Sequence, residues 1–287
     1  MSIPGLRSTI QDRGRTGHVR DGIPPAGPAD PIAFAAALEL AGCAPDDAAI
    51  EIAGLPFAFT CDDRRIVAAT GREVRIRTRG RIPGWTSALA RAGQEVIVDG
   101  SAATRFAYLA VSGGFDLPRV LGSRATYLAA ALGPLPRPLV AGDTLPLGAS
   151  TAGVESAGRR IAPSAYGRVV RAVLGPHDLR FPDETVRAFF GGTFAVHADS
   201  DRMGVRLTGT ALVPPDGELL TCGIVAGAVQ VPRGGAPIVL LADHQTTGGY
   251  PILATVVHAD LGIVAQASPG QYLRFERVTP EEARRSA

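Results

Sequence analysis

The sequence contains no lysine and no asparagine, although it has 287 residues. All 29 of its basic residues are arginine, a bias typical of a GC-rich genome. The chain therefore has no Schiff-base lysine, no phosphate-loop lysine and no lysine to carry biotin or lipoate. Without asparagine it has no N-glycosylation site. If its reaction needs biotin or a conventional phosphate-loop nucleotide, another chain must supply that part.

Cysteine is scarce, and the three cysteines, Cys43, Cys61 and Cys222, lie far apart. Because no C-x-x-C pair is present, the sequence predicts neither a zinc knuckle nor a disulfide framework. No uncharged apolar run reaches the roughly 18 residues of a membrane span. The N-terminal residues lack the apolar region of a signal peptide. We therefore expect a cytoplasmic protein that does not span a membrane.

Net charge is also low, at +2, and no block of arginines is interleaved with aromatic residues. Such a balance argues against nucleic acid and against an anionic membrane surface as partners. Hydrophobic residues make up 46% of the chain and charged residues 20%, so a large core can form. These values indicate a globular protein that acts on small molecules or on other proteins.

Most of the chain is expected to form short strands between turns, because it has 35 glycines and 23 prolines. Glycine turns that lead into strands recur at Gly93, Gly142 and Gly270, a habit of β-barrels. The sequence therefore predicts a mostly β fold with two β-barrel-like halves and a few short helices. The predicted strands are Arg65–Thr70, Glu73–Thr78, Glu95–Val98, Phe106–Val111, Val169–Leu174, Thr193–His197, Ala228–Val231, Ile238–Ala242, Ile252–His258 and Tyr272–Arg277.

Three helices have recognisable ends. The first begins after Asp30 as N-cap and ends before Gly42, the second runs from Asp183 to about Phe190, and the last begins at the capping box of Thr279 and Glu282. The length suits two domains better than one. The small, polar segment 151–164 is the best linker candidate, between an N-terminal half at 1–150 and a C-terminal half at 165–287.

The stretch Asp243–Pro251 concentrates hydrogen-bonding side chains and two adjacent glycines between the apolar runs 238–242 and 252–257. Strand, polar turn and strand is how a β scaffold presents a site. Gly248 and Gly249 can take a positive φ or let a ligand approach the backbone closely. The alternative is an ordinary β-turn, which is the commoner use of a glycine pair.

Familiar catalytic motifs are absent: there is no phosphate-binding G-x-x-x-x-G-K, no G-x-S-x-G and no H-E-x-x-H. His197 with Asp199, and His258 with Asp260, could bind a metal only if folding joined them, because metal sites usually need a third ligand. We therefore expect no metal site. Four polar segments remain, namely Gln11–Arg15, Pro24–Asp30, Gly122–Arg124 and Ser200–Leu207.

Each of these segments has a structural alternative. Asp30 can serve as an N-cap, Gln11 and Asp12 can cap a turn, and Arg202 can pair with a neighbouring aspartate. Together, however, they resemble one family in order and spacing. The matching motifs are Gln-Asp-x-Gly-Arg at 11–15, Pro-x-Gly-x-x-Asp at 25–30, Gly-Ser-Arg at 122–124, Asp-Arg-Met-Gly at 201–204, Gln-Val-Pro at 230–232, Asp-x-x-Thr-Thr-Gly-Gly-Tyr-Pro at 243–251 and Ala-Gln-x-x-Pro-Gly at 265–270.

The family is that of allophanate hydrolase subunit 2, also called KipA or the C component of 5-oxoprolinase. The same module forms the A and B subdomains of the carboxyltransferase part of urea carboxylase. The resemblance implies a cyclophilin-like barrel and a partner like KipI, or allophanate hydrolase subunit 1. In the oxoprolinase version a lactam-utilisation-type third subunit joins, and the complex binds ATP, which can lie on another subunit, and opens 5-oxo-L-proline to glutamate.

The carboxylase version instead receives a carboxyl group from biotin on a separate carrier and transfers it to urea or a related amide. A third alternative is a regulatory protein that binds a KipI-like partner without chemistry. The sequence departs from the family pattern at Cys43, where asparagine is usual, and at Thr221-Cys222, where a Ser-Glu type of pair is common. The second departure adjoins the expected site.

Both candidate reactions develop charge on a carbonyl or ureido oxygen. Suitable donors are Arg202, the amides of Gly248 and Gly249, and the hydroxyls of Thr246 and Thr247. Asp243 or Asp30 could act as a base if burial raised its pKa. The predicted substrate-binding residues are Gln230, Gln245 and Tyr250, which could orient a planar amide, together with Gln11 and Arg124. The hypothesis is that residues 230–250 and Arg202 line one pocket, with Asp30 and Gln11 nearby.

Overall fold

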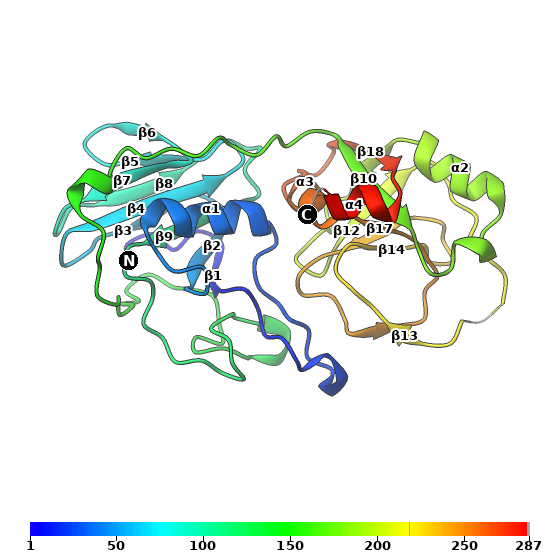
Figure 1. Ribbon diagram of the computed structural model, residues 1–287, viewed down its shortest axis with the longest axis horizontal. Coiled ribbons are helices and arrows are strands. Elements are labelled where there is room, and N and C mark those ends of the chain that lie inside the picture. The colour runs from blue at the N-terminus through cyan, green and yellow to red at the C-terminus, as the bar shows by residue number, and fades with distance from the viewer. Residues whose placement is uncertain (218, 286–287) are drawn as a thin grey trace. The chain divides into compact units, whose positions relative to one another are not determined.

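The computed structural model describes residues 1–217 and 219–285 and shows short strands with a few short helices (Figure 1). By its internal contacts the chain divides into two compact units. The first unit comprises Met1–Arg15 and Ala26–Ala165, and the second comprises Thr16–Pro25 and the chain from Tyr166 onward. Residues 16–25, expected in the first half, thus belong to the second unit. In the described part of the chain, no helix has the length and hydropathy to cross a membrane.

The first unit contains two antiparallel sheets whose apolar faces pack together. Core side chains come from both, for example Ile50 and Leu109 from one sheet and Phe57 and Val98 from the other. In order, the five-stranded sheet is β1 (Arg7–Gln11), β2 (Ala49–Ala53), β9 (Phe106–Val111), β4 (Arg65–Gly71) and β7 (Thr86–Ala90). The four-stranded sheet is β3 (Phe57–Phe59), β8 (Val96–Asp99), β5 (Arg75–Arg77) and β6 (Arg81–Pro83). This unit is a pair of open sheets and not a closed barrel.

Helix α1 (Pro31–Ala41) forms as its end signals predict. The carboxylate of Asp30 accepts a hydrogen bond from the amide of Ala33 at 3.1 Å, and Gly42 ends the helix in the left-handed conformation. The helix packs against β4 and β9. The ring of its Phe34 meets the edge of Tyr108, with ring centroids 6.2 Å apart.

The segment expected to be a linker, 151–164, belongs to the first unit. It contains the short 3-10 helix η3 (Val154–Ser156) and then runs beside β7. Main-chain hydrogen bonds join Gly158 and Arg159 to Ser87, and Ile161 to Trp85. Because its backbone groups are satisfied by β7, this polar stretch is held in place.

The second unit is a closed barrel of seven strands. In order around the barrel they are β10 (Val169–Leu174), β17 (Ile252–Val256), β14 (Ala228–Gln230), β15 (Ile238–Leu240), β12 (Gly204–Gly209), β11 (Phe194–Val196) and β18 (Tyr272–Arg277). A parallel pairing of β10 with β18 closes the ring. A separate two-stranded ribbon joins β13 (Cys222–Gly223) to β16 (Thr247–Gly248).

Helix α2 (Asp183–Gly191) covers one side of this barrel. Its Phe189 is fully buried and stacks on Phe275 of β18, with ring centroids 4.5 Å apart. At α4 (Pro280–Arg285) the predicted capping box is present, since Thr279 and Glu282 exchange hydrogen bonds. The remaining helical segments are α3 (Leu261–Ala265), η1 (Val19–Asp21), η2 (Leu128–Ala130), η4 (Asp178–Arg180) and η5 (His258–Asp260).

Candidate functional site

The loop between β15 and β17 carries the predicted motif and is built as strand, turn and strand. Its middle forms β16, in which Gly248 lies opposite Cys222 of β13. Neither Gly248 nor Gly249 has a positive φ. Glycine is therefore needed here only if another group comes close to the backbone. A methyl group at Gly248 would lie only 2.5 Å from the side chain of Ile224 and 3.2 Å from Nε2 of Gln230. The glycine therefore makes room for side chains that converge on this point.

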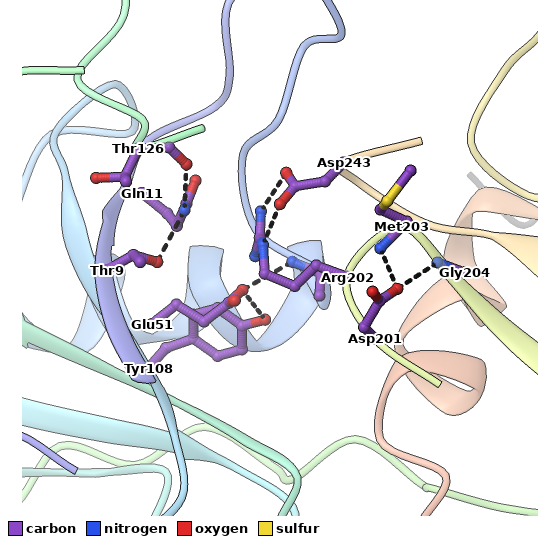
Figure 2. Close-up of polar contacts among 11 residues, drawn as sticks. Thr9, Gln11, Glu51, Tyr108, Thr126, Asp201, Arg202, Met203, Gly204 and Asp243 are labelled. Carbon is purple, nitrogen blue, oxygen red and sulfur yellow. Dashed lines mark hydrogen bonds and ion pairs between the residues drawn. The ribbon is translucent and has the colours of Figure 1, made fainter. Parts of the chain in front are cut away.

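A buried ion pair ties the start of this loop to the Ser200–Gly204 turn. Nε and Nη2 of Arg202 donate to the two carboxylate oxygens of Asp243 at 2.8 and 2.9 Å, and Figure 2 shows the two groups facing each other. Both side chains are only about a tenth exposed. The amide of Asp243 also donates to the carbonyl of Arg202. Two residues predicted to act as base and as oxyanion donor thus form a bidentate clamp that joins two loops.

The turn before this clamp is closed by its own aspartate. One carboxylate oxygen of Asp201 accepts hydrogen bonds from the amides of Met203 and Gly204, as drawn in Figure 2. An aspartate in this role stabilises a tight turn. Arg202 therefore leaves a rigid loop in a defined direction, and it pairs with Asp243 where the sequence suggested Asp201 or Asp199.

A cavity of about 690 Å³ opens beside the loop. Four predicted residues line it, namely Gln245, Gly248, Gly249 and Tyr250. The described lining does not include Arg202, Asp243, Thr246, Thr247 or Gln230. Its other walls include Pro214, Pro215, Gly217 and Leu219, and the turn after β14. The structure thus brings four predicted residues together at one cavity, and their role in substrate binding stays a prediction.

Two carboxamides converge on Gly248, since Nε2 of Gln230 and Nε2 of Gln245 would lie 3.2 and 3.5 Å from a Cβ there. Gln230 is 1% exposed, and Nε2 of Gln245 donates weakly to its Oε1 at 3.4 Å. Nε2 of Gln230 is buried and has no hydrogen-bond partner among the described residues. A buried amide donor without an acceptor costs free energy, so such groups are rare in folded proteins. The amide donor of Gln230 thus lies next to Gly248, which lines the cavity.

Arg233 lies on the cavity wall and was not predicted. It follows the Gln-Val-Pro strand end, is exposed, and could provide a cation to an anionic substrate group. An arginine directly before the glycine turn at 234–235 was the signal that could have revealed it.

The two predicted threonines have different surroundings. Thr246 is 7% exposed, and its carbonyl accepts a hydrogen bond from the amide of Ile224. Thr247 is exposed and lies in β16 opposite Gly223. Their roles as hydroxyl donors to a substrate stay predictions. Tyr250 is half exposed at the cavity, where its ring can cover a bound molecule.

His244 is a buried histidine in the motif that the sequence did not single out. Its Nδ1 lies 2.6 Å from the carbonyl oxygen of Gln245, and because a carbonyl only accepts, Nδ1 carries the proton. Burial lowers the pKa of His244 below its usual 6.5, more than this hydrogen bond and Asp243 raise it. At neutral pH the ring is therefore neutral.

In the first unit, Gln11 and Arg124 belong to a buried network. Nε2 of Gln11 donates to Thr9 and to the carbonyl of Thr126, and the side chain is fully buried (Figure 2). Asp12 accepts hydrogen bonds from the hydroxyl of Ser123 and the amide of Arg124. These bonds fasten the Gly-Ser-Arg turn to the end of β1. Substrate binding by Gln11 and Arg124 stays a prediction.

Asp30 also belongs to the first unit, where it caps α1 beside a buried carboxylate. The hydroxyl of Tyr108 donates to Glu51 at 2.8 Å and accepts from the amide of Asp30 at 2.8 Å. Burial and the neighbouring charges of Glu51 and Asp30 raise the pKa of Tyr108 well above its ordinary value. The phenol therefore stays protonated and holds the loop that precedes the helix. Asp30 as a catalytic base remains a prediction.

Among the described residues, no group of three histidine, cysteine or acidic side chains is placed to hold a metal ion. The aspartate of each His-x-Asp pair has a defined contact. His197 lies 3.5 Å from Asp199, and Asp260 forms a bidentate pair with Arg171. Burial raises the pKa of both Cys43 and Cys61 to about 11, so these thiols are unreactive at neutral pH.

The family model for the carboxyltransferase domain, subdomains A and B, matches residues 21–277. The chain therefore belongs to this family of carboxyltransferase A and B subdomains. It is 37% identical to the C component of 5-oxoprolinase from Escherichia coli over 97% of this chain and 91% of that protein. The resemblance inferred from the ordered motifs is thereby confirmed.

Solved structures show the same fold. The structure of TTHA0988 has a TM-score of 0.86 at 32% identity and covers 96% of this chain but 54% of that one. The urea carboxylase of Kluyveromyces lactis has a TM-score of 0.86 at 27% identity, covering 98% of this chain and 27% of that one. The chain thus spans about half and about a quarter of these proteins. The expected mostly β fold with a cyclophilin-like barrel is confirmed.

Two substitutions of Asp30 can distinguish its role as the N-cap of α1 from a role as catalytic base. Asp30→Asn retains an oxygen that accepts from Ala33, so we expect a stability change within about 0.5 kcal/mol, whereas Asp30→Ala should cost about 1 kcal/mol. The only tryptophan, Trp85, is buried in the first unit, so its fluorescence in urea reports the unfolding of that unit. If Asp30 is also a base, the Asn variant loses turnover at unchanged stability. Full turnover in that variant would exclude catalysis by this carboxylate.

Breaking the clamp should destabilise the second unit. Arg202→Ala leaves the carboxylate of Asp243 buried without its bidentate partner, which costs about 3 kcal/mol. Thermal unfolding followed by circular dichroism measures the loss. The matched control is Arg206→Ala on β12, whose exposed side chain should contribute less than about 0.5 kcal/mol. Equal melting temperatures for the two variants would contradict a structural clamp.

The lowered pKa of His244 predicts a pH dependence of stability. The unfolded chain binds this proton near the ordinary pKa of 6.5, and the folded protein binds it more weakly. The free energy of unfolding should therefore fall as the pH drops below about 6.5 towards 5. His244→Gln should make this slope shallower in urea titrations, by at most one proton. An unchanged slope would mean that His244 is not protonated on unfolding in this range.

Proposed function

We propose that this chain is a subunit of an ATP-dependent lactam hydrolase complex that opens 5-oxo-L-proline to L-glutamate together with a KipI-like subunit. The likeness to the C component of 5-oxoprolinase over nearly the whole length of both proteins supports this choice. The observation on this chain that carries it is the buried amide of Gln230 beside a cavity, for which residues 1–217 and 219–285 provide no acceptor. A lactam offers the carbonyl acceptor that this donor lacks.

The cavity residues, together with Gln230 beside Gly248, suit the parts of such a substrate. Nε2 of Gln230 donates to the lactam oxygen, and it donates more strongly as that oxygen gains charge. Arg233 binds the carboxylate, and Tyr250 covers the ring. In the overall change the carbon–nitrogen bond of the ring breaks, water adds its hydroxyl to the carbonyl carbon, and a proton passes to nitrogen. The chain holds and polarises the lactam in this scheme.

ATP is expected to bind on another subunit of the complex. This chain has no lysine and no glycine-rich phosphate loop that ends in one. A lactam-utilisation-type third subunit is the proposed place for the nucleotide. ATP hydrolysis then drives ring opening, while the cavity described above fixes the substrate.

The second candidate is transfer of a carboxyl group from biotin to urea or a related amide. It is favoured by the fold shared with urea carboxylase at a TM-score of 0.86. Biotin would arrive on a separate carrier, because the chain has no lysine to attach it. A planar urea could use the two carboxamides of Gln230 and Gln245 as a lactam does.

The test is reconstitution of the chain with a KipI-like protein and a lactam-utilisation-type protein. We expect glutamate to form from 5-oxoproline only when ATP and all subunits are present. Activity that requires a biotinylated carrier and bicarbonate would favour the second candidate. Tight binding of the KipI-like protein without turnover of either substrate would instead indicate a regulatory protein.

Gln230 provides the sharpest variant within this complex. Because its Nε2 has no partner among the described residues, Gln230→Met should keep or raise the melting temperature, whereas turnover should fall about 100-fold through loss of a donor to the reacting oxygen. Gln271→Met, in a turn of the same unit, is the matched control with near-normal turnover. A large loss of stability in Gln230→Met would show that the amide serves the fold instead.

A further inference from the structure

The β5–β6 hairpin of the first unit carries a concentration of positive charge. Residues 72–81 include five arginines and one glutamate, a net charge of +4, whereas the whole chain carries +2. The hairpin forms one end of the four-stranded sheet (Figure 1). The side chains of Arg75 and Arg77 are about two-fifths exposed, and Arg79 and Arg81 are exposed. This surface is far more basic than the chain as a whole.

The pairing of the strands places like charges against each other. Arg77 of β5 lies directly opposite Arg81 of β6, so the two side chains emerge on the same face of the sheet. Buried Ile76 and its partner Ile82 point to the other face, where Ile76 belongs to the core. Like charges directly opposite one another destabilise a sheet. The arrangement therefore costs stability unless an anion compensates it.

Acidic residues of the same sheet compensate only one side of the hairpin. Asp99 of β8 lies 3.8 Å from Nε of Arg75 and 3.3 Å from Nε of Arg77. Nε of Arg77 is nevertheless buried without a hydrogen-bond partner. For Arg79 and Arg81, the described residues 1–217 and 219–285 provide no side-chain hydrogen bond or ion pair. The positive charge thus remains on the β6 side.

Protection of the sheet edge explains a part of this pattern. Charged residues and proline on an edge strand prevent unwanted strand pairing, and Arg81 and Pro83 fit that role. Arg75 and Arg77 do not, because β5 is an interior strand that pairs with both β6 and β8. The turn residue Arg79 lies outside both strands. Edge protection therefore does not explain Arg75, Arg77 and Arg79.

A cleft of about 350 Å³ lies at this turn. It is lined by Arg77, Thr78, Arg79, Gly80, Arg81, Glu95 and Ile97. Three guanidinium groups and a hydroxyl provide donors that suit carboxylates. Glu95 is the one acidic residue of the lining. No aromatic side chain lines the cleft, whereas single-stranded nucleic acids are usually held by bases stacked on aromatic rings.

We propose that the β5–β6 hairpin docks an extended acidic segment of a partner protein. Along a strand, alternate side chains on one face are about 7 Å apart, and an extended peptide with acidic residues at every second position has the same spacing. Its carboxylates then meet Arg75 and Arg77, which are alternate residues on one face of β5, with Arg81 opposite Arg77 and Arg79 at the turn. The bound segment supplies the negative charge that the sheet lacks on the β6 side.

The experiment uses a fluorescein-labelled peptide in which glutamate and serine alternate, with binding to the full chain measured by anisotropy at about 150 mM salt. We expect the variant Arg77→Gln/Arg81→Gln to bind about tenfold more weakly, since two charge-assisted contacts are lost. It should melt at the same or a higher temperature, because a like-charge pair is removed. The control Arg206→Gln/Arg274→Gln removes the same charge from exposed positions of the second unit and should bind normally.

Two further probes can overturn the proposal. An isomeric peptide with all glutamates in one block should bind more weakly than the alternating one, because it reaches fewer arginines. Equal affinities for the two peptides, or equal losses in the two double variants, would reduce the effect to net charge and refute docking. Tighter binding of a polyuridine RNA than of either peptide would assign the hairpin to nucleic acid and refute it as well.

Discussion

The bidentate pair of Arg202 and Asp243 is the interaction on which the candidate site depends. The two residues are far apart in the chain, and each belongs to a loop that leaves the barrel. Because both charged groups are about nine-tenths buried, each is stable only in the presence of the other. The pair therefore fixes where the motif loop begins and how it runs past the barrel. The clamp holds the loop that forms one wall of the cavity, although neither Arg202 nor Asp243 belongs to the described lining.

A second feature of the site, the buried amide of Gln230, lowers the stability of the fold. In the described part of the chain the amide donor of Gln230 has no acceptor, whereas most buried polar groups in proteins find a partner. Gly248 keeps the adjacent space open, since a side chain there would meet Ile224 and Gln230. Stability given up at such a point is typical of a functional site. The pair of Arg202 and Asp243 holds the motif loop in place, whereas the amide of Gln230 is placed to bind a ligand.

Local signals predicted the helices and many strands well. Asp30, Pro31 and Gly42 bound α1, and Thr279 with Glu282 starts α4, because capping depends only on neighbours in the chain. The strands β1 and β2 were missed, since their inward-facing residues include Gln11 and Glu51, which look like surface residues in sequence. Their burial depends on distant partners such as Thr126 and Tyr108. Periodicity cannot reveal such partners.

The sequence by itself determined the family, the mostly β class and the chemical inventory of the Asp243–Pro251 loop, because these depend on residue order and residue type. It also settled that no lysine chemistry is possible. Only the tertiary structure decided what each polar residue does. Arg202 clamps Asp243, Gln11 fastens a turn, and Gln230 is left with an open donor. Arg77 and Arg81 of the β5–β6 hairpin lie opposite each other because of the register in which the two strands pair. Each of these outcomes depends on which strands become neighbours, and that pairing is set by packing between residues distant in the chain.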